Sequence, residues 1–226
     1  MSLRHWLYAL LAALCAGCGG GSPDDPHPAP GPRVIEFYGD SLTFGSIAGP
    51  AGELARLAVP PVRRAQELLG DAALCVDLSL PGATAADALA GVAGMPFGPF
   101  AEHVRATLAD TLVLRYGAAD AVRGVALADF ERDLEALVAL ARKSHKRVLL
   151  VGVIPLHPAG DVTQAMADRA DAFDAAVERV ADAHATGWVD VRAVPATLPD
   201  DLADPVHPAQ AWSDRITAAI VQMLGP

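Results

Sequence analysis

A serine that can act as a nucleophile stands in the short motif Gly39-Asp40-Ser41-Leu42. The motif follows an apolar run at residues 34–38, which predicts a buried strand that Gly39 ends. A serine at such a strand-to-helix turn has an exposed hydroxyl and a backbone N–H that points outward, which suits an attacking group. Gly-Asp-Ser also forms ordinary turns, so the motif alone leaves both interpretations open.

An acid and a histidine stand three positions apart near the C-terminus, as Asp204 and His207. The imidazole of His207 can take the proton of Ser41 as a general base and return it to a leaving alcohol as a general acid. Asp204 can accept a hydrogen bond from the other ring nitrogen and so fix its tautomer. The alternative is a turn histidine with a turn acid, and Asp200 and Asp201 compete for the acid role.

These side chains meet only if the elements between them alternate between strands and helices. Apolar runs predict the strands, and stripes at helical spacing with capping residues predict the helices. We expect strands at 34–38, 74–78, 111–116, 148–154 and 188–191, and helices at 61–69, 84–92, 126–143, after Thr163 and from about Ala209.

Strand–helix alternation predicts parallel strands that are joined by right-handed crossovers. The expected fold class is therefore α/β, a three-layer α/β/α sandwich around a five-stranded parallel sheet of the flavodoxin-like kind. Ligands bind beyond the carboxyl ends of such strands, where the sequence places Ser41, Gly82 and Gly117.

The serine motif and the Asp-x-x-His motif together resemble those of the GDSL, or SGNH, hydrolase family. The resemblance extends over about residues 33–224. It implies the fold of that family and a serine ester hydrolase that uses no cofactor, with a triad formed by Ser41, His207 and Asp204. We found no spacing of residues that is typical of a metal site, so no metal is expected.

The resemblance also implies how the oxyanion is bound. The backbone N–H groups of Ser41 and of Gly82, in Pro-Gly-Ala-Thr at residues 81–84, are the expected donors. In the family a third donor is the Asn of Gly-x-Asn-Asp, but residues 117–120 read Gly-Ala-Ala-Asp, so Ala119 offers no side-chain donor. Asp40 and Asp120 are expected to organise their loops as hydrogen-bond acceptors.

Loss of one such donor typically costs about 10²–10³ in kcat. The substitution at Ala119 therefore predicts a weakened esterase, a site with a substitute donor, or a relative without activity that binds an acylated glycan or lipid. The expected substrates are a small acyl ester, a lysophospholipid or an O-acylated glycan, and the loops do not distinguish among them.

The N-terminal segment resembles an export signal, with Arg4 before an apolar stretch that is too short to span a bilayer. Residues 1–17 are the expected signal peptide, and Ala-Gly-Cys at its end resembles a bacterial lipoprotein site, which implies lipidation of Cys18; ordinary cleavage is the alternative. Residues 18–32 predict a flexible tether and residues 33–226 the hydrolase-like domain. We expect an exported lipoprotein, periplasmic or anchored to the outer membrane.

The composition also argues against some classes of binding partner. A net charge of −10 without basic stripes argues against nucleic acid and against electrostatic docking on anionic lipid, so membrane contact is expected only through the lipid anchor. Two of the three cysteines lie in the leader, which leaves no disulfide framework, and Cys75 is expected to be a buried structural thiol. The oligomeric state is not indicated.

Three smaller expectations concern the core. Glu36 and Arg115 stand in neighbouring apolar strands and are predicted to pair, unless each reaches solvent. The apolar loop at residues 95–100 either lines an acyl pocket or packs on the core. His103, like His145 and His184, is expected on a helix surface.

Overall fold

The computed structural model describes residues 31–49 and 53–225. The predicted signal peptide, Cys18 and nearly all of the predicted tether lie outside the described residues. The described chain contains a five-stranded sheet whose strands are all parallel, in the order β4-β1-β5-β6-β7. These strands are β1 (Arg33–Gly39), β4 (Ala73–Asp77), β5 (Thr111–Arg115), β6 (Arg147–Val151) and β7 (Gly187–Val189).

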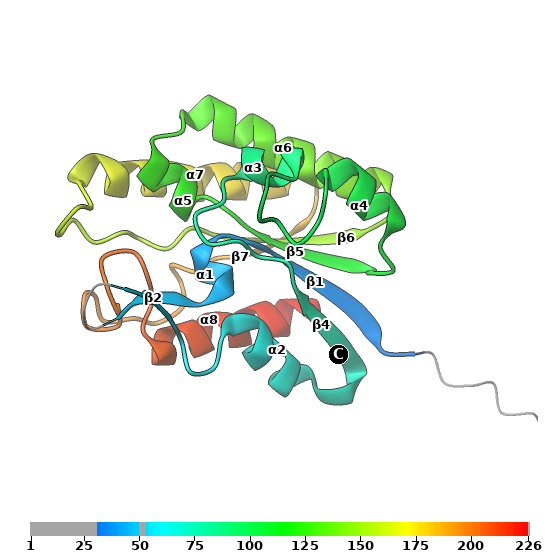
Figure 1. Ribbon diagram of the computed structural model, residues 1–226, viewed down its shortest axis with the longest axis horizontal. Helices are drawn as coiled ribbons and strands as arrows, with labels where there is room; N and C mark the ends of the chain where they lie inside the picture. The colour runs from blue at the N-terminus through cyan, green and yellow to red at the C-terminus, as the bar shows by residue number, and fades with distance from the viewer. Residues whose placement is uncertain (1–30, 50–52, 226) are drawn as a thin grey trace, which may run out of the picture. The chain divides into compact units, whose positions relative to one another are not determined.

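Helices cover both faces of the sheet (Figure 1). One face carries α2 (Pro61–Leu69) and α8 (Gln210–Leu224), and the other carries α3 (Ala85–Ala90), α4 (Phe100–Ala106), α5 (Ala118–Arg123), α6 (Leu127–Lys143) and α7 (Gln164–Ala183). The three-layer α/β/α fold is therefore confirmed. No helix in the described part of the chain has the length and apolar character needed to cross a membrane.

The helices lie where their apolar stripes and caps predict them. The Thr163 side chain accepts a hydrogen bond from the backbone N–H of Met166 and caps α7, and Thr84 caps α3 in the same way. The predicted face of α8 is buried through Trp212, Ile216 and Ile220. Short-range signals were sufficient for these elements because capping and periodicity are local properties of the chain.

Several short elements had no sequence signal. These are α1 (Ser41–Phe44), the hairpin of β2 (Ser46–Ala48) and β3 (Leu54–Arg56), the 3₁₀ turn η2 (Gly70–Ala72), and the helices α4 and α5. Helices of this length are not stable alone, so tertiary contacts rather than periodicity decide where they form. The predicted strand at 148–154 ends at Val151, because an apolar run reports burial and not strand pairing.

The predicted pair of Glu36 and Arg115 is wrong. Glu36 lies opposite Leu112 and Arg115 lies opposite Gly39, and neighbouring residues of a strand point to opposite faces. The two charged side chains therefore project from opposite faces of the sheet. The prediction took account of which strands are neighbours but not of their register.

Glu36 finds other partners on its own face of the sheet. Its carboxylate accepts hydrogen bonds from the hydroxyls of Tyr38 and Thr107, and the His103 ring lies 3.2 Å away. The His103 ring also packs 5.2 Å from that of Phe97, so the expectation of a surface histidine is wrong for this residue. Cys75 is only half-buried, because β4 is an edge strand.

The apolar loop at residues 95–100 packs on the core. Phe97 and Phe100 are buried, and both rings meet the Tyr38 ring edge-on, at centroid distances of 5.2 and 5.4 Å. This loop therefore takes the second of the two roles predicted for it.

Candidate active site

Ser41 is the first residue of α1, directly beyond the carboxyl end of the inner strand β1. A glycine is required two residues before Ser41, because a Cβ atom at Gly39 would lie 2.5 Å from the carbonyl oxygen of Arg115. Asp40 then caps α1 by accepting a hydrogen bond from the Leu42 N–H at 2.9 Å. The tight turn thus places Ser41 at the edge of the sheet.

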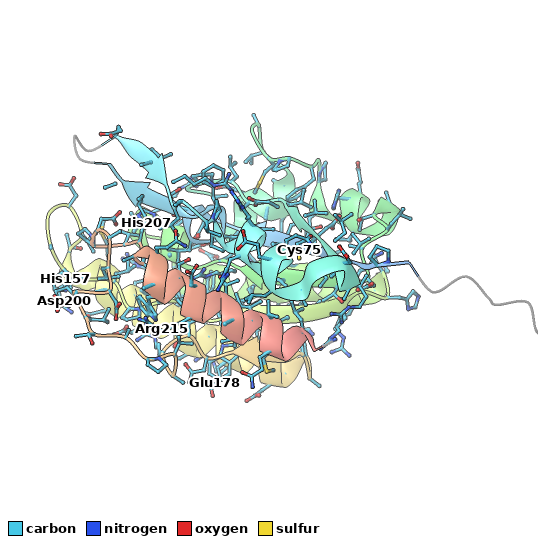
Figure 2. The ribbon with its side chains drawn as sticks, turned by 90° about the horizontal axis from the view of Figure 1, so that it is seen from below. Cys75, His157, Glu178, Asp200, His207 and Arg215 are labelled. Atoms are coloured by element: carbon cyan, nitrogen blue, oxygen red, sulfur yellow. The ribbon has the colours of Figure 1, made fainter. Side chains whose placement is uncertain are left out.

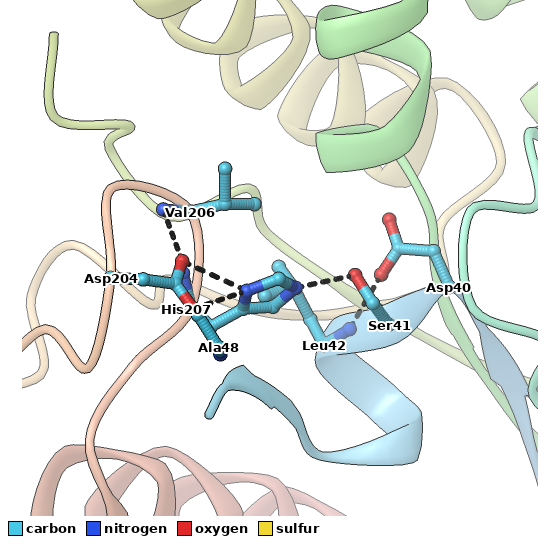
Figure 3. A network of polar contacts seen from close by, with 7 residues as sticks. All are labelled: Asp40, Ser41, Leu42, Ala48, Asp204, Val206 and His207. Carbon is cyan, nitrogen blue, oxygen red and sulfur yellow. Dashed lines mark hydrogen bonds and ion pairs between the residues drawn. The ribbon is translucent and has the colours of Figure 1, made fainter. Parts of the chain in front are cut away.

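A continuous chain of hydrogen bonds joins Ser41, His207 and Asp204 (Figure 3). The Nε2 atom of His207 lies 2.9 Å from Ser41 Oγ, and the Nδ1 atom lies 2.8 Å from Asp204 Oδ2. Because an ionised carboxylate only accepts hydrogen bonds, Nδ1 carries the proton of the neutral ring. The lone pair of Nε2 is then available to accept the hydroxyl proton of Ser41.

Asp204 is held by backbone donors as well as by the imidazole. Its Oδ1 atom accepts from the N–H groups of Val206 and His207, both at 2.9 Å, and its Oδ2 atom accepts from the Ala48 N–H at 2.8 Å. Burial opposes ionisation, but the hydrogen bonds from His207, Val206 and Ala48 outweigh it and lower the pKa of Asp204 to about 2. The carboxylate is therefore ionised at neutral pH.

The other candidate acids point elsewhere. Asp201 pairs with Arg215 at 3.0 Å and accepts from the Thr197 N–H, and Asp200 is exposed. Figure 2 shows Asp200, His157 and His207 at the same end of the molecule, where α8 begins. Of the three acids considered from the sequence, Asp204 is the one that contacts His207.

Gly82 lies in a tight turn beside the nucleophile. The Ala83 N–H donates to the Leu80 carbonyl at 3.0 Å, and Gly82 has a φ of 78° between them, as position i+2 of a type II turn requires. The Leu80 N–H donates to the Gly39 carbonyl and so ties this turn to the end of β1. Within the described residues, the N–H groups of Gly82 and Ser41 donate no hydrogen bond, so both are available to a ligand.

Ala119 lies beside the acid that precedes the nucleophile. Its backbone N–H donates to Asp40 Oδ2 at 3.0 Å, and its side chain is buried in the first turn of α5. Asp120 accepts from the Ala85 N–H at 3.2 Å and links α5 to α3, which is the contact expected of a loop-organising acceptor. Burial and, to a smaller extent, the charge of Asp40 raise the pKa of Asp120 to about 7, although the hydrogen bond from the Ala85 N–H lowers it.

Arg115 supports the turn that carries Ser41. Its Nη1 atom donates to the Leu42 carbonyl at 3.1 Å, while Nε and Nη2 have no protein partner within the described chain. Burial lowers the pKa of Arg115 to about 10, and the nearby Asp40 carboxylate opposes this shift. Burial likewise raises the pKa of Asp40, and the Ala119 and Leu42 N–H groups and the Arg115 charge oppose that effect.

A cavity of about 370 Å³ adjoins His207. Its walls come from the hairpin of β2 and β3, from residues 159–162 and from the segment that carries Asp204 and His207. Aliphatic side chains predominate, with Ile47, Leu54 and Val162 among them. The described residues contain no cluster of side chains that could hold a metal ion.

Sequence reasoning missed the part played by Ala48 and Arg115. The Ala48 contact uses a backbone N–H, which leaves no trace in the residue type. Arg115 had a signal, a charge in an apolar strand, but the prediction ignored the strand register and assigned it to the wrong partner. The hairpin wall of the cavity had no signal, because the chain after Ser41 is rich in Gly, Ala and Pro.

Residues 37–213 match the model of the GDSL-like lipase/acylhydrolase family. Because the match covers most of the chain, this protein belongs to that family. No curated protein sequence matches it.

Three solved structures illustrate the shared fold. The chain is similar to Est24, a carbohydrate acetylesterase from Sinorhizobium meliloti, with 17% identity and a TM-score of 0.71 over 85% of this chain and 98% of that one. It is similar to the aryl esterase of M. smegmatis, with 17% identity and a TM-score of 0.72 over the same shares. It is also similar to Axe2, an acetylxylan esterase from Geobacillus stearothermophilus, with 22% identity and a TM-score of 0.65 over 86% and 94%.

Proposed function

We propose that this protein is a serine esterase that cleaves carboxylic esters through Ser41, His207 and Asp204. The observation that carries the proposal is the unbroken path of hydrogen bonds from Ser41 Oγ through the imidazole to an ionised carboxylate. Membership of a family of lipases and acylhydrolases supports the same reaction class.

The reaction follows from the tautomer of His207. As Ser41 Oγ attacks the ester carbonyl, Nε2 takes its proton, and Asp204 stabilises the imidazolium that forms. His207 then gives the proton to the leaving alcohol, and an acyl-enzyme on Ser41 remains. Water, activated by the same nitrogen, releases the acid and restores the hydroxyl.

The oxyanion is bound by the free N–H groups of Ser41 and Gly82. Since Ala119 supplies no side-chain donor, the transition state has one hydrogen bond fewer than the family pattern provides, at a cost of about 10²–10³ in kcat. We therefore expect slow turnover with a complete triad.

The cavity beside His207 favours esters with a small apolar part on the alcohol side. In the tetrahedral intermediate the leaving oxygen must lie near Nε2 of His207, and the aliphatic wall lies on this side of the site. Acetyl or other short acyl esters of apolar alcohols are the proposed substrates. The related structures include an aryl esterase and acetylesterases that act on carbohydrates.

The test compares the protein with its Ser41→Ala variant in the hydrolysis of p-nitrophenyl acetate. We expect measurable activity that this substitution reduces to the background rate, and labelling of Ser41 by a fluorophosphonate. Ser144→Ala, at the far end of α6, is the matched control and retains full activity. Equal rates for the protein and Ser41→Ala would refute the esterase assignment.

A second candidate function is a binding protein that keeps the fold and holds an acylated glycan or lipid. The observation that favours it is Ala119, which removes a donor from the site. A protein of this kind would give neither hydrolysis nor labelling of Ser41, yet would bind an acylated ligand in the cavity beside His207.

We also propose that the chain is exported and lipidated on Cys18, which places the domain on a bacterial membrane. The proposal rests on the leader and on Ala-Gly-Cys at residues 16–18. Metabolic labelling with a fatty acid should mark the protein but not its Cys18→Ala variant. Labelling of both would refute it.

A further inference from the structure

The two ends of the sheet differ in charge. The chain carries −10 overall, but acids gather in the loops beyond the carboxyl ends of the strands, where Asp40, Asp120 and Asp204 lie. The opposite end, where the strands begin and α8 ends, carries six cations, and the exposed acids Asp71 and Asp110 lie there too, just before β4 and β5. We call that end the basic pole, and its residues are Arg33, Arg105, Leu108, Arg142, Lys143, Lys146, Arg147 and Met223.

In the part of the chain that the structure describes, the cations of the basic pole form no ion pair with a carboxylate. Most surface arginines elsewhere in the domain form ion pairs with carboxylates: Arg56, Arg63, Arg64, Arg123, Arg132, Arg179, Arg192 and Arg215. By contrast, no ion pair within residues 31–49 and 53–225 involves a cation of the basic pole. Both lysines of the chain, Lys143 and Lys146, belong to it.

Exposed apolar side chains lie among these cations. Leu108 is 90% exposed, and the Lys146 ammonium donates to the carbonyls of Thr107 and Ala109 on either side of it. Met223 is 44% exposed, and its carbonyl accepts from Arg147. A polar cleft of about 310 Å³ is lined by Arg142, Lys146, Arg147 and Met223, so cations and an exposed apolar side chain share it.

The chain that precedes the domain joins it at this same end. Arg33, the first residue of β1, donates to the carbonyls of Leu224 and Gly225, and Arg147 shares the Leu224 carbonyl. Figure 1 shows that the start of β1 and the C-terminus lie together, away from α1 and β2. A chain that is anchored through its N-terminal part would therefore enter the domain at the basic pole.

We propose that the basic pole docks on an anionic lipid surface. Cations without a carboxylate partner attract the headgroups, and exposed Leu108 and Met223 enter the boundary between headgroups and acyl chains. Nucleic acid fits less well, because its phosphates can pair with the cations but leave the exposed Leu108 side chain in water. The net charge argues against this contact because it sums over the whole chain and so hides the cations that gather at one end.

Docking in this way turns the site away from the membrane, a consequence that rests on the proposed esterase function. Ser41 and His207 lie at the opposite end of the sheet, so the substrate is met in the aqueous phase. Among the substrates expected from the sequence, soluble acyl esters are favoured over lysophospholipid in the same bilayer.

The test uses the chain from Gly19 to Pro226, which lacks Cys18 and contains the compact unit Pro32–Pro226. Sedimentation with vesicles of phosphatidylcholine, with and without 30% phosphatidylglycerol, measures binding at low and high salt. We expect binding only to the anionic vesicles and its loss at high salt. Arg142→Gln with Lys143→Gln should weaken it roughly 25-fold, at roughly fivefold for each charge, and Leu108→Ser roughly tenfold.

Matched variants at other places serve as controls. Arg63→Gln with Arg64→Gln on α2, and Leu127→Ser at the start of α6, remove the same groups and should leave binding unchanged. Equal binding to neutral vesicles, equal losses in the controls, or tighter binding to duplex DNA would overturn the proposal. Vesicle binding requires no catalysis, so it can fail or succeed independently of the esterase assignment.

Discussion

The carboxylate of Asp40 accepts the backbone N–H of Ala119 at 3.0 Å, while its other oxygen caps the helix that begins with Ser41. One fully buried acid thus joins the turn that carries Ser41 to the first turn of α5. Arg115, also buried, lies close enough for each charge to affect the pKa of the other. Both side chains bind the backbone of Leu42, the residue after the nucleophile, and so fix the turn that carries Ser41.

Asp40→Asn should weaken both activity and stability. An amide group in place of one oxygen cannot accept from both the Leu42 and Ala119 N–H groups, and Arg115 loses its countercharge. We expect kcat to fall about tenfold to a hundredfold, and the free energy of unfolding to fall by about 1–3 kcal/mol, as for a buried donor left without an acceptor. Urea unfolding and steady-state kinetics measure the two effects.

The double variant Asp40→Asn with Arg115→Met separates charge from packing. If the charges interact, the double variant is less destabilised than the sum of the two single variants. Additive losses would contradict the coupling. Asp129→Asn, an exposed acid on α6, is the control for a change of net charge.

Ala48→Pro tests the hydrogen bond that the Ala48 N–H donates to Asp204. Proline has no N–H, so Asp204 loses the donor at 2.8 Å, and its pKa should rise from about 2. We expect kcat to fall about tenfold, because the carboxylate orients His207 less well, with KM little changed. Ala48→Gly keeps the N–H and is the matched control. An equal loss in both variants would assign the effect to the hairpin rather than to the hydrogen bond.

Asp120 should make stability decline with pH. Its pKa is about 7 in the folded state, above the unfolded value of about 3.9, so the folded chain binds more protons than the unfolded chain between these values. Its contribution to stability is therefore present below about pH 4 and is lost as pH rises toward 7. Asp120→Asn keeps an acceptor for the Ala85 N–H and should flatten this part of the curve. Urea unfolding at pH 4, 5.5 and 7 measures the difference, and identical slopes would contradict the prediction.

Ala119→Asn should raise kcat if the triad works and lacks one oxyanion donor. The expected gain is up to about 10²–10³, with KM nearly unchanged, because the new bond forms mainly in the transition state. Ala119→Leu, which adds a similar side chain without a donor, is the control. No gain together with no labelling of Ser41 would favour the binding function.

The sequence alone determined the fold class, most of the helices and strands of the sandwich, and the choice of Ser41, Asp204 and His207. These follow from apolar periodicity, capping residues and motif spacing, which are properties of neighbouring residues. Through resemblance to the family, it also pointed to Gly82 and Ala119 as oxyanion positions, and these two roles stay predictions.

Only the tertiary structure decided the contacts that depend on register and on backbone groups. It placed Glu36 and Arg115 on opposite faces of the sheet, because a strand alternates its side chains and the pairing of β1 with β5 sets the phase. It brought the Ala48 N–H to Asp204 across 156 positions of the chain. It also gathered cations without a carboxylate partner at one end, since parallel strands bring all their starting ends to the same edge.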